Sequence, residues 1–173
     1  SRIVNNSGGG VGASNGALLE LENCFVGHGT GAMHAVNIVS GSEASIIYST
    51  LVAGFDNFED VYALQCTAPG AVVIRNSFLG TLDNAGADIF CGTATVSSSA
   101  SQVAIAGVNN VDLPDIGAMW FGDINSGDLQ LDAPPAALLT AAEWNEGDPP
   151  TDIDGDARPT VDGTADVAGA DVP

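Results

Sequence analysis

Residues 19–26 read LELENCFV, residues 45–52 read SIIYSTLV and residues 72–79 read VVIRNSFL. The three stretches start at nearly equal intervals along the chain, and a glycine follows closely after each of them. The matching apolar positions are Leu21, Ile47 and Ile74, and the matching polar positions are Asn23, Ser49 and Asn76. Self-similarity at a fixed period indicates a repeat architecture.

A second strand-like segment lies between these stretches, at residues 35–39, 62–66 and 88–91, with nearly the same period. Short β-rich segments that return once in each such period are typical of the coils of a parallel solenoid. We therefore predict an all-β, right-handed parallel β-helix of about three to four coils over residues 1–110, each coil about 4.8 Å from the next. An antiparallel sandwich would not need such a self-match.

The composition changes beyond residue 110. Residues 111–173 hold 14 of the 22 acids and seven of the eight prolines. We interpret this segment as an acidic C-terminal cap, because an open solenoid end exposes its core and an unpaired strand edge. Helix signals within it predict a short helix, with Asp132 as N-cap, Pro134 and Pro135 in the first turn, residues 136–144 as the body and Gly147 as C-cap.

The 173 residues suit one domain with a continuous core, and the net charge is −19. The three cations are Arg2, Arg75 and Arg158, and the chain has no lysine. Three scattered arginines cannot form a basic patch, so a nucleic-acid partner and an anionic membrane surface are excluded. The same deficit disfavours a cleft for an acidic polysaccharide.

Cys66 and Cys91 are separated by close to one coil period, and each ends the second strand of its coil. Stacked residues on neighbouring strands lie within the Cα range of a disulfide. We therefore predict a Cys66–Cys91 disulfide with Cys24 free and buried. The alternative is two stacked, buried thiols.

Asp152, Asp154 and Asp156 alternate around Gly155. Such an arrangement can direct several carboxylate oxygens at one Ca²⁺ ion, although the spacing departs from that of an EF-hand loop. The alternative is a turn without metal, in which Arg158 pairs with Asp152 or Asp154. Both readings remain open from the sequence.

The tail also carries a family resemblance. Residues 127–131, 135–138, 151–159 and 161–171 resemble the C-terminal ending of bacterial right-handed parallel β-helix proteins of the polymorphic-outer-membrane-protein-like, choice-of-anchor type. The stretch TDIDGDARP at 151–159 is the most specific part, whereas the final glutamate of that ending and a following anchor are missing. The resemblance implies an exported, surface-exposed protein. Because the chain opens on SRIVNN without a methionine, we also expect it to be a piece of a longer one.

Two classes of function follow. The first is a non-catalytic structural or adhesive module with a glycan or protein partner at the cell surface, which joins the rest of its chain or self-associates through the solenoid end. The second is a carbohydrate-active enzyme, a polysaccharide lyase or hydrolase, whose site would combine loop carboxylates. The acids near equivalent loops are Asp56, Glu59, Asp60, Asp83 and Asp88. The scarcity of basic residues favours the first class. We expect Arg75 to pair with an acid, and His28 and His34 are too flexibly spaced to form a metal pair.

Overall fold

The computed structural model describes residues 1–6, 9–27, 34–54, 61–81, 88–113 and 120–173. Most strands belong to three parallel sheets, which we call A, B and C. Sheet A contains β1 (Arg2–Val4), β4 (Phe25–Gly27), β7 (Thr50–Ala53), β10 (Phe78–Thr81), β13 (Ala100–Ser101) and β14 (Val111–Asp112). Sheet B contains β2 (Val11–Ala13), β5 (Val36–Val39), β8 (Leu64–Thr67) and β11 (Ile89–Phe90). Sheet C contains β3 (Leu18–Glu22), β6 (Glu43–Ile47), β9 (Val72–Arg75) and β12 (Ala94–Ser97).

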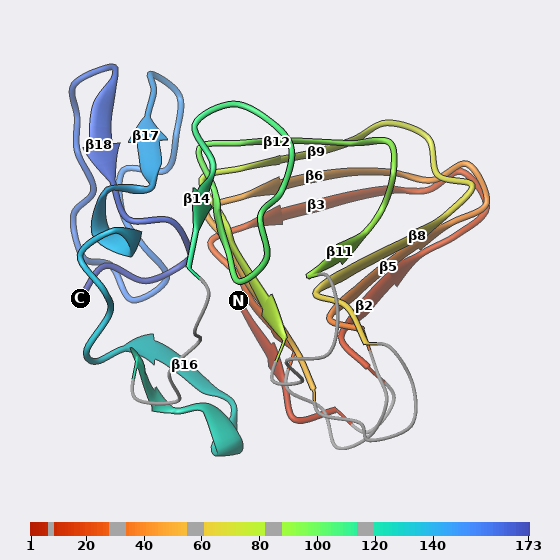
Figure 1. Cartoon of the computed structure of the whole chain (residues 1–173), viewed down its shortest axis with the longest axis horizontal. Coiled ribbons are helices and arrows are strands. Elements are labelled where there is room, and N and C mark those ends of the chain that lie inside the picture. Colours follow the sequence, from red (N-terminus) through yellow and green to blue (C-terminus); the bar gives the residue numbers. More distant parts are fainter. Residues whose placement is uncertain (7–8, 28–33, 55–60, 82–87, 114–119) are drawn as a thin grey trace.

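On each coil the chain passes through sheets B, C and A in turn, and the next coil stacks on the last (Figure 1). The three sheets are thus the three sides of a β-solenoid of about three turns. The predicted all-β parallel solenoid is confirmed.

The coils stack one residue away from the register that the sequence match suggested. Leu21 pairs with Ile46, and Ile46 with Ile74, so the first offset is shorter and the second longer than in that match. Ile47 instead shares a row with Glu22 and Arg75. Since successive side chains of a strand point to opposite faces, this shift decides which isoleucine enters the interior. Ile46 is fully buried, whereas Ile47 is only partly buried.

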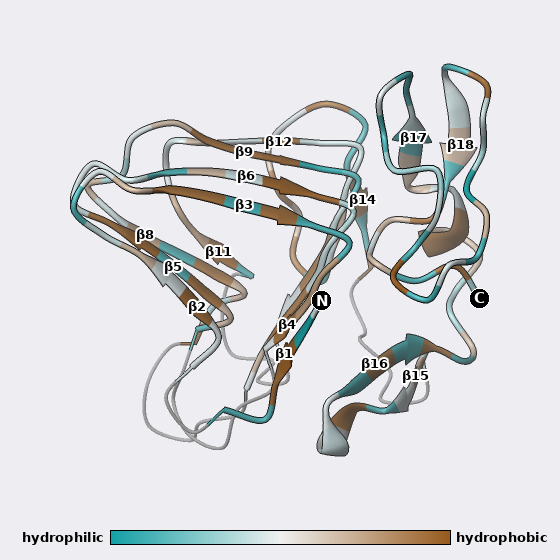
Figure 2. Cartoon of the chain, turned by 180° about the vertical axis from the view of Figure 1, so that it is seen from behind, coloured by the Kyte–Doolittle hydropathy of each residue, from teal (hydrophilic) through white to brown (hydrophobic). Residues whose placement is uncertain are grey.

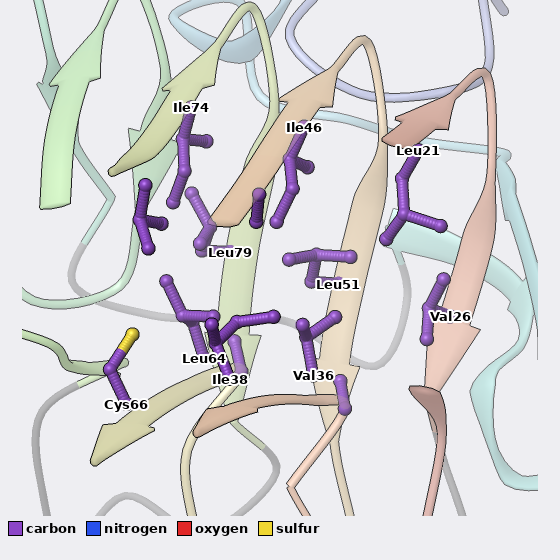
Figure 3. Close-up of a cluster of buried hydrophobic side chains, with 14 of the residues drawn as sticks. Leu21, Val26, Val36, Ile38, Ile46, Leu51, Leu64, Cys66, Ile74 and Leu79 are labelled. Carbon is purple, nitrogen blue, oxygen red and sulfur yellow. The ribbon is translucent and has the colours of Figure 1, made fainter. Parts of the chain in front are cut away.

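The interior is a stack of aliphatic side chains drawn from all three sheets (Figure 3). Its labelled members are Leu21, Val26, Val36, Ile38, Ile46, Leu51, Leu64, Cys66, Ile74 and Leu79. Burial of a side chain of this size stabilises a fold by about 1.5–3 kcal/mol. The stacked rows therefore supply the main driving force for coil formation.

A column of serines, which we call the serine column, lies where the chain turns from sheet C to sheet A. The hydroxyls of Ser49, Ser77 and Ser99 each donate to the carbonyl two residues earlier, at 3.0, 2.9 and 2.8 Å. The same oxygens accept the backbone N–H of Cys24, Ser49 and Ser77 in the preceding coil, at 3.3, 3.1 and 3.2 Å. Each hydroxyl thus satisfies a buried carbonyl and a buried N–H of the turn.

The residue before each of these serines, and the residue before Cys24 in the first coil, lie in the left-handed region. These four residues, the corner column, are Asn23, Tyr48, Asn76 and Ser98, with φ of 48, 46, 53 and 46°. Asparagine tolerates this conformation well, whereas tyrosine adopts it at a cost. The polar column expected from the sequence, with Ser49 between Asn23 and Asn76, is therefore wrong by one residue. Tyr48 holds the corner, and Ser49 belongs to the serine column.

Cys66 and Cys91 are joined by a disulfide that links β8 to the end of β11, with a Cα–Cα distance of 4.8 Å. That distance is one inter-strand spacing, because the two residues follow the register pair Gln65 and Phe90 on adjacent strands. Cys24 is free and buried at the edge of the serine column.

The acidic tail packs on the coils as a cover, in the part of it that the structure describes. It lies along the outer face of sheet A, at the side of the solenoid (Figures 1 and 2). Its elements are β15 (Phe121–Asp123), the 3-10 turns η2 (Ile124–Ser126) and η3 (Leu138–Thr140), β16 (Asp128–Leu131), β17 (Ala142–Trp144) and β18 (Thr164–Asp166). Phe25, Val52 and Phe78 point outward from sheet A and are buried under this tail. A sheet with apolar residues on both faces needs cover on both.

The short helix expected over residues 136–144 is only a single 3-10 turn, η3. It is followed at once by β17, which pairs antiparallel with β18. The side chain of Asn76 donates to the carbonyl of Glu143 at 2.9 Å and accepts its N–H at 3.2 Å. Hydrogen bonds from the solenoid thus hold Glu143 extended, and tertiary contacts override local helix propensity. No helix in the described part of the chain is long and apolar enough to cross a membrane.

Replacing one member of the serine column tests its contribution. We expect Ser77→Ala to lower the free energy of unfolding by about 1–3 kcal/mol, because the Arg75 carbonyl and the Ser49 N–H lose their buried partner. The matched control is Ser45→Ala, at a partly exposed position of β6, which should change stability by less than about 0.5 kcal/mol. Urea unfolding followed by far-UV circular dichroism measures both. Equal effects would mean that the column contributes nothing specific.

Candidate functional site

The predicted calcium-binding acids lie in a tight turn of the tail. Asp152 is buried, and its Oδ1 accepts the N–H groups of Asp154, Gly155 and Asp156, each at 2.8 Å. Its Oδ2 accepts the N–H of Val172 at 2.9 Å. Both carboxylate oxygens therefore bind backbone donors of the turn.

The other two acids of the turn point elsewhere. Asp154 receives the Arg2 guanidinium at 2.7 and 2.8 Å and the Gln130 amide at 2.8 Å, and Asp156 is exposed. Within the described residues, no group of three or more His, Cys, Asp or Glu side chains could hold a metal ion. The three carboxylates are not brought together around a common point, so the geometry supports a hydrogen-bonded turn in place of the calcium site.

Arg158 does not pair with Asp152 or Asp154, contrary to the alternative reading. It is buried, bonds Asp166 at 3.1 Å and donates to the carbonyl of Gly169 at 2.8 Å. Its guanidinium also lies 4.0 Å from the centre of the Tyr48 ring. Burial and the nearby Asp166 carboxylate raise the pKa of Tyr48, so the phenol stays neutral. Arg158 thus fastens the tail to the corner column.

Arg75 makes an ion pair between solenoid and tail, and it pairs with an acid as the sequence led us to expect. Its guanidinium bonds both carboxylate oxygens of Asp148, one of them at 2.8 Å. The Asp148 side chain is fully buried and also accepts the N–H of Asn145 at 2.9 Å. The hydrogen bonds to Asp148 raise the pKa of Arg75 above its already high value. The third arginine, Arg2, pairs with Asp154 in a largely exposed position. All three cations of the chain therefore bind tail acids.

One buried carboxyl is perturbed without a cation. Asp88, just before β11, is 1% exposed, and its Oδ2 accepts the N–H of Val103 at 2.7 Å. Its Oδ1 has no hydrogen-bond partner within the described regions. Burial raises the pKa of Asp88 to about 6. The residue borders a cavity of about 250 Å³ whose other walls include Ile89, Val96 and Ile105.

Of the remaining predicted loop acids, Asp56, Glu59, Asp60 and Asp83 lie outside the described residues, as does His28. Glu20, Glu22 and Glu43 are exposed on strands of sheet C and point to solvent. Of the five predicted loop acids, only Asp88 lies within the described residues, and the nearby Asp112 carboxylate contributes to its raised pKa.

Sequence reasoning missed an aromatic row on sheet B. The rings of His34 and Tyr62 stack with centres 5.5 Å apart, and those of Tyr62 and Phe90 with centres 5.2 Å apart. The His34 Nδ1 accepts the N–H of Tyr62 at 3.0 Å, which fixes the imidazole beside the ring it stacks on. Part of the signal was available, because the interval between His34 and Tyr62 matches the offset between β5 and β8, whereas Phe90 is in register with Gln65 and not with Tyr62.

The comparisons with known proteins return nothing: no family model, no curated protein and no solved structure matches this chain. The bacterial β-helix resemblance is thus untested by them.

The buried and the exposed arginine pair should contribute differently to the free energy of unfolding. We expect Arg75→Met to cost about 3 kcal/mol, because it leaves the buried Asp148 carboxylate without its cation. Arg2→Met removes an exposed pair and should cost less than about 1 kcal/mol. Both tryptophans, Trp120 and Trp144, lie in the tail, so their fluorescence during urea unfolding reports its release. Equal losses in the two variants would contradict this assignment.

The acidic turn predicts stability independent of calcium. We expect the thermal midpoint to be the same with excess Ca²⁺ and with chelator, because the Asp152 oxygens already accept four backbone N–H groups. Asp152→Ala should cost about 2–3 kcal/mol in either condition. A bound calcium ion at 100 times its dissociation constant would instead add about 2.7 kcal/mol, and a rise of that size would contradict the prediction.

Asp88 predicts a pH effect of defined sign. Its folded pKa of about 6 exceeds the unfolded value of about 3.9, so the fold binds the proton more tightly. The associated stability is present below the unfolded pKa and is lost as the pH rises through about 6. We expect wild type to lose up to about 3 kcal/mol relative to Asp88→Asn over this window. Urea titrations of both proteins from pH about 4 to about 7 measure the difference, and parallel profiles would refute it.

Proposed function

We propose that this chain is a non-catalytic structural or adhesive module of an exported, surface-exposed bacterial β-helix protein. The observation that carries this proposal is the use of its charged groups. Each arginine binds a tail acid, and Asp152 accepts four backbone N–H groups. Groups committed to internal contacts hold a shape and are not free for chemistry.

Further support comes from how the module is held together. The Cys66–Cys91 disulfide ties neighbouring coils, and such bridges persist in oxidising compartments. The tail packs on sheet A through apolar side chains and is joined to the solenoid by the ion pairs of Arg2 and Arg75. These features suit a rigid element that displays its outer faces outside the cell.

The alternative, a carbohydrate-active enzyme, is favoured by one observation. A carboxyl with a pKa near 6, such as that of Asp88, is suited to donate a proton at neutral pH. It borders a cavity, but a glycosidase also needs a second carboxylate facing it. Asp112, which contributes to the raised pKa, is exposed. Asp88 alone therefore makes the enzyme the second candidate.

An assay of the whole chain on neutral and acidic polysaccharides separates the two. We expect no new reducing ends and no unsaturated uronate products above a blank without protein. Turnover that disappears in Asp88→Asn would overturn the proposal in favour of the enzyme.

The mass of the unreduced protein tests the proposed export. After export to an oxidising compartment, we expect this mass to be two hydrogen atoms below that of the fully reduced protein. Three free thiols would argue against export.

A further inference from the structure

The outer face of sheet B differs from the rest of this acidic chain. Its outward positions, as far as the structure describes them, are Gly12, Asn37, Val39, Gln65, Thr67 and Phe90, preceded by His34 and Tyr62. None of these is an acid or an arginine, although the chain carries a net charge of −19. An uncharged sheet face is unusual on a chain with this net charge.

This face combines rings with amides in fixed rows. Asn37, Gln65 and Phe90 pair in register on β5, β8 and β11, so the two amides and the phenyl ring form one row across the strands. The rings of His34 and Tyr62, on the residues that precede β5 and β8, stack with centres 5.5 Å apart, and the Phe90 ring at the end of the amide row stacks on Tyr62 with centres 5.2 Å apart. Centre separations of this size are typical of offset stacking, in which neighbouring rings cover part of each other's faces.

Within the described part of the chain, Thr67 and Phe90 are exposed on this face and Gln65 is partly buried, whereas the Oδ1 of Asn37 is buried without a hydrogen-bond partner. The tail lies against sheet A, on another side of the solenoid (Figures 1 and 2). Phe90, at the end of the stack, is 58% exposed. A large exposed aromatic ring beside an ordered row of amides is typical of a binding surface.

We propose that the outer face of sheet B binds a neutral, extended, β-linked hexose chain. Aromatic faces pack against the apolar C–H faces of pyranose rings, and amides exchange hydrogen bonds with hydroxyls. An extended β-linked chain presents C–H faces and hydroxyls in turn, so one unit can pack on the exposed Phe90 ring while its neighbour meets the Gln65 amide on the adjacent strand. This inference rests on the proposed adhesive function and gives its partner a chemical class.

The charge of the protein selects against other ligands. An acidic polysaccharide would approach a chain of charge −19 whose three arginines are all paired with carboxylates. A basic partner would gain more from the acidic tail than from an uncharged face. A neutral polyhydroxyl chain meets neither repulsion nor a better site elsewhere.

The test is a titration of the whole chain with cellohexaose, followed by calorimetry and by amide chemical shifts. We expect weak binding, with shifts of the side-chain amides of Asn37 and Gln65. Phe90→Leu keeps apolar bulk but removes the ring, and should weaken binding about three- to tenfold, whereas Phe90→Tyr should retain it. The control is Val161→Ala, at a 67% exposed apolar position of the tail, which should leave binding unchanged. The thermal midpoint of each variant checks that it is folded.

Several results would overturn the inference: no binding, an affinity unaffected by Phe90→Leu, shifts confined to other surfaces, or tighter binding of polygalacturonate than of cellohexaose. Reducing ends are measured in the same samples. Cleaved cellohexaose would refute the non-catalytic function. Absence of both binding and cleavage would refute only the glycan inference.

Discussion

Stacking of each coil on the last in one register is the constraint on which this structure depends. The backbone hydrogen bonds of three sheets run between coils, and the serine column continues them through the turn where the chain leaves sheet C. A shift by one residue would replace Ile46 with Ile47 in the interior and break that column. Interior packing and the corner hydrogen bonds thus favour the same register of the coils. When side-chain packing and local hydrogen bonding agree in this way, the sequence specifies one structure.

The repeat was predictable because stacked coils place like residues over like. The apolar and polar periodicity of residues 19–26, 45–52 and 72–79 specified the solenoid, but not its register, since the two unequal offsets of the true register have the same average as those read from the sequence. The tail was less predictable. Its helix signals were local, whereas its conformation is set by contacts such as that of Asn76 with Glu143, 67 residues away. One usable signal was overlooked: β7 and β10 are buried on both faces, as near-continuous apolar strands are when something covers their outside.

The scarcity of cations explains how the acidic residues of the candidate site are accommodated. With three cations against 22 acids, the chain can neutralise few carboxylates, and it places all its arginines between solenoid and tail or within the tail. Two acids without a cation show the alternatives: the Asp152 carboxylate accepts backbone N–H groups, whereas burial of Asp88 raises its pKa. The alternation of acids around Gly155 resembled a metal loop because both arrangements need several oxygens near a tight turn. Which donor fills that turn depends on partners that local sequence does not reveal.

The position of the tail along the side of the solenoid has a consequence for how the protein can evolve. Repeat proteins commonly change length by duplication or loss of whole coils, because each coil contacts only its neighbours. Here successive corner residues bind different points of the tail: Asn23 binds the carbonyl of Thr151, Tyr48 packs on Arg158, and Asn76 binds Glu143. Insertion or deletion of one coil would move these partners apart by one inter-strand spacing, about 4.8 Å, which exceeds the reach of a hydrogen bond. These contacts with the tail therefore fix the number of coils that lie beside it.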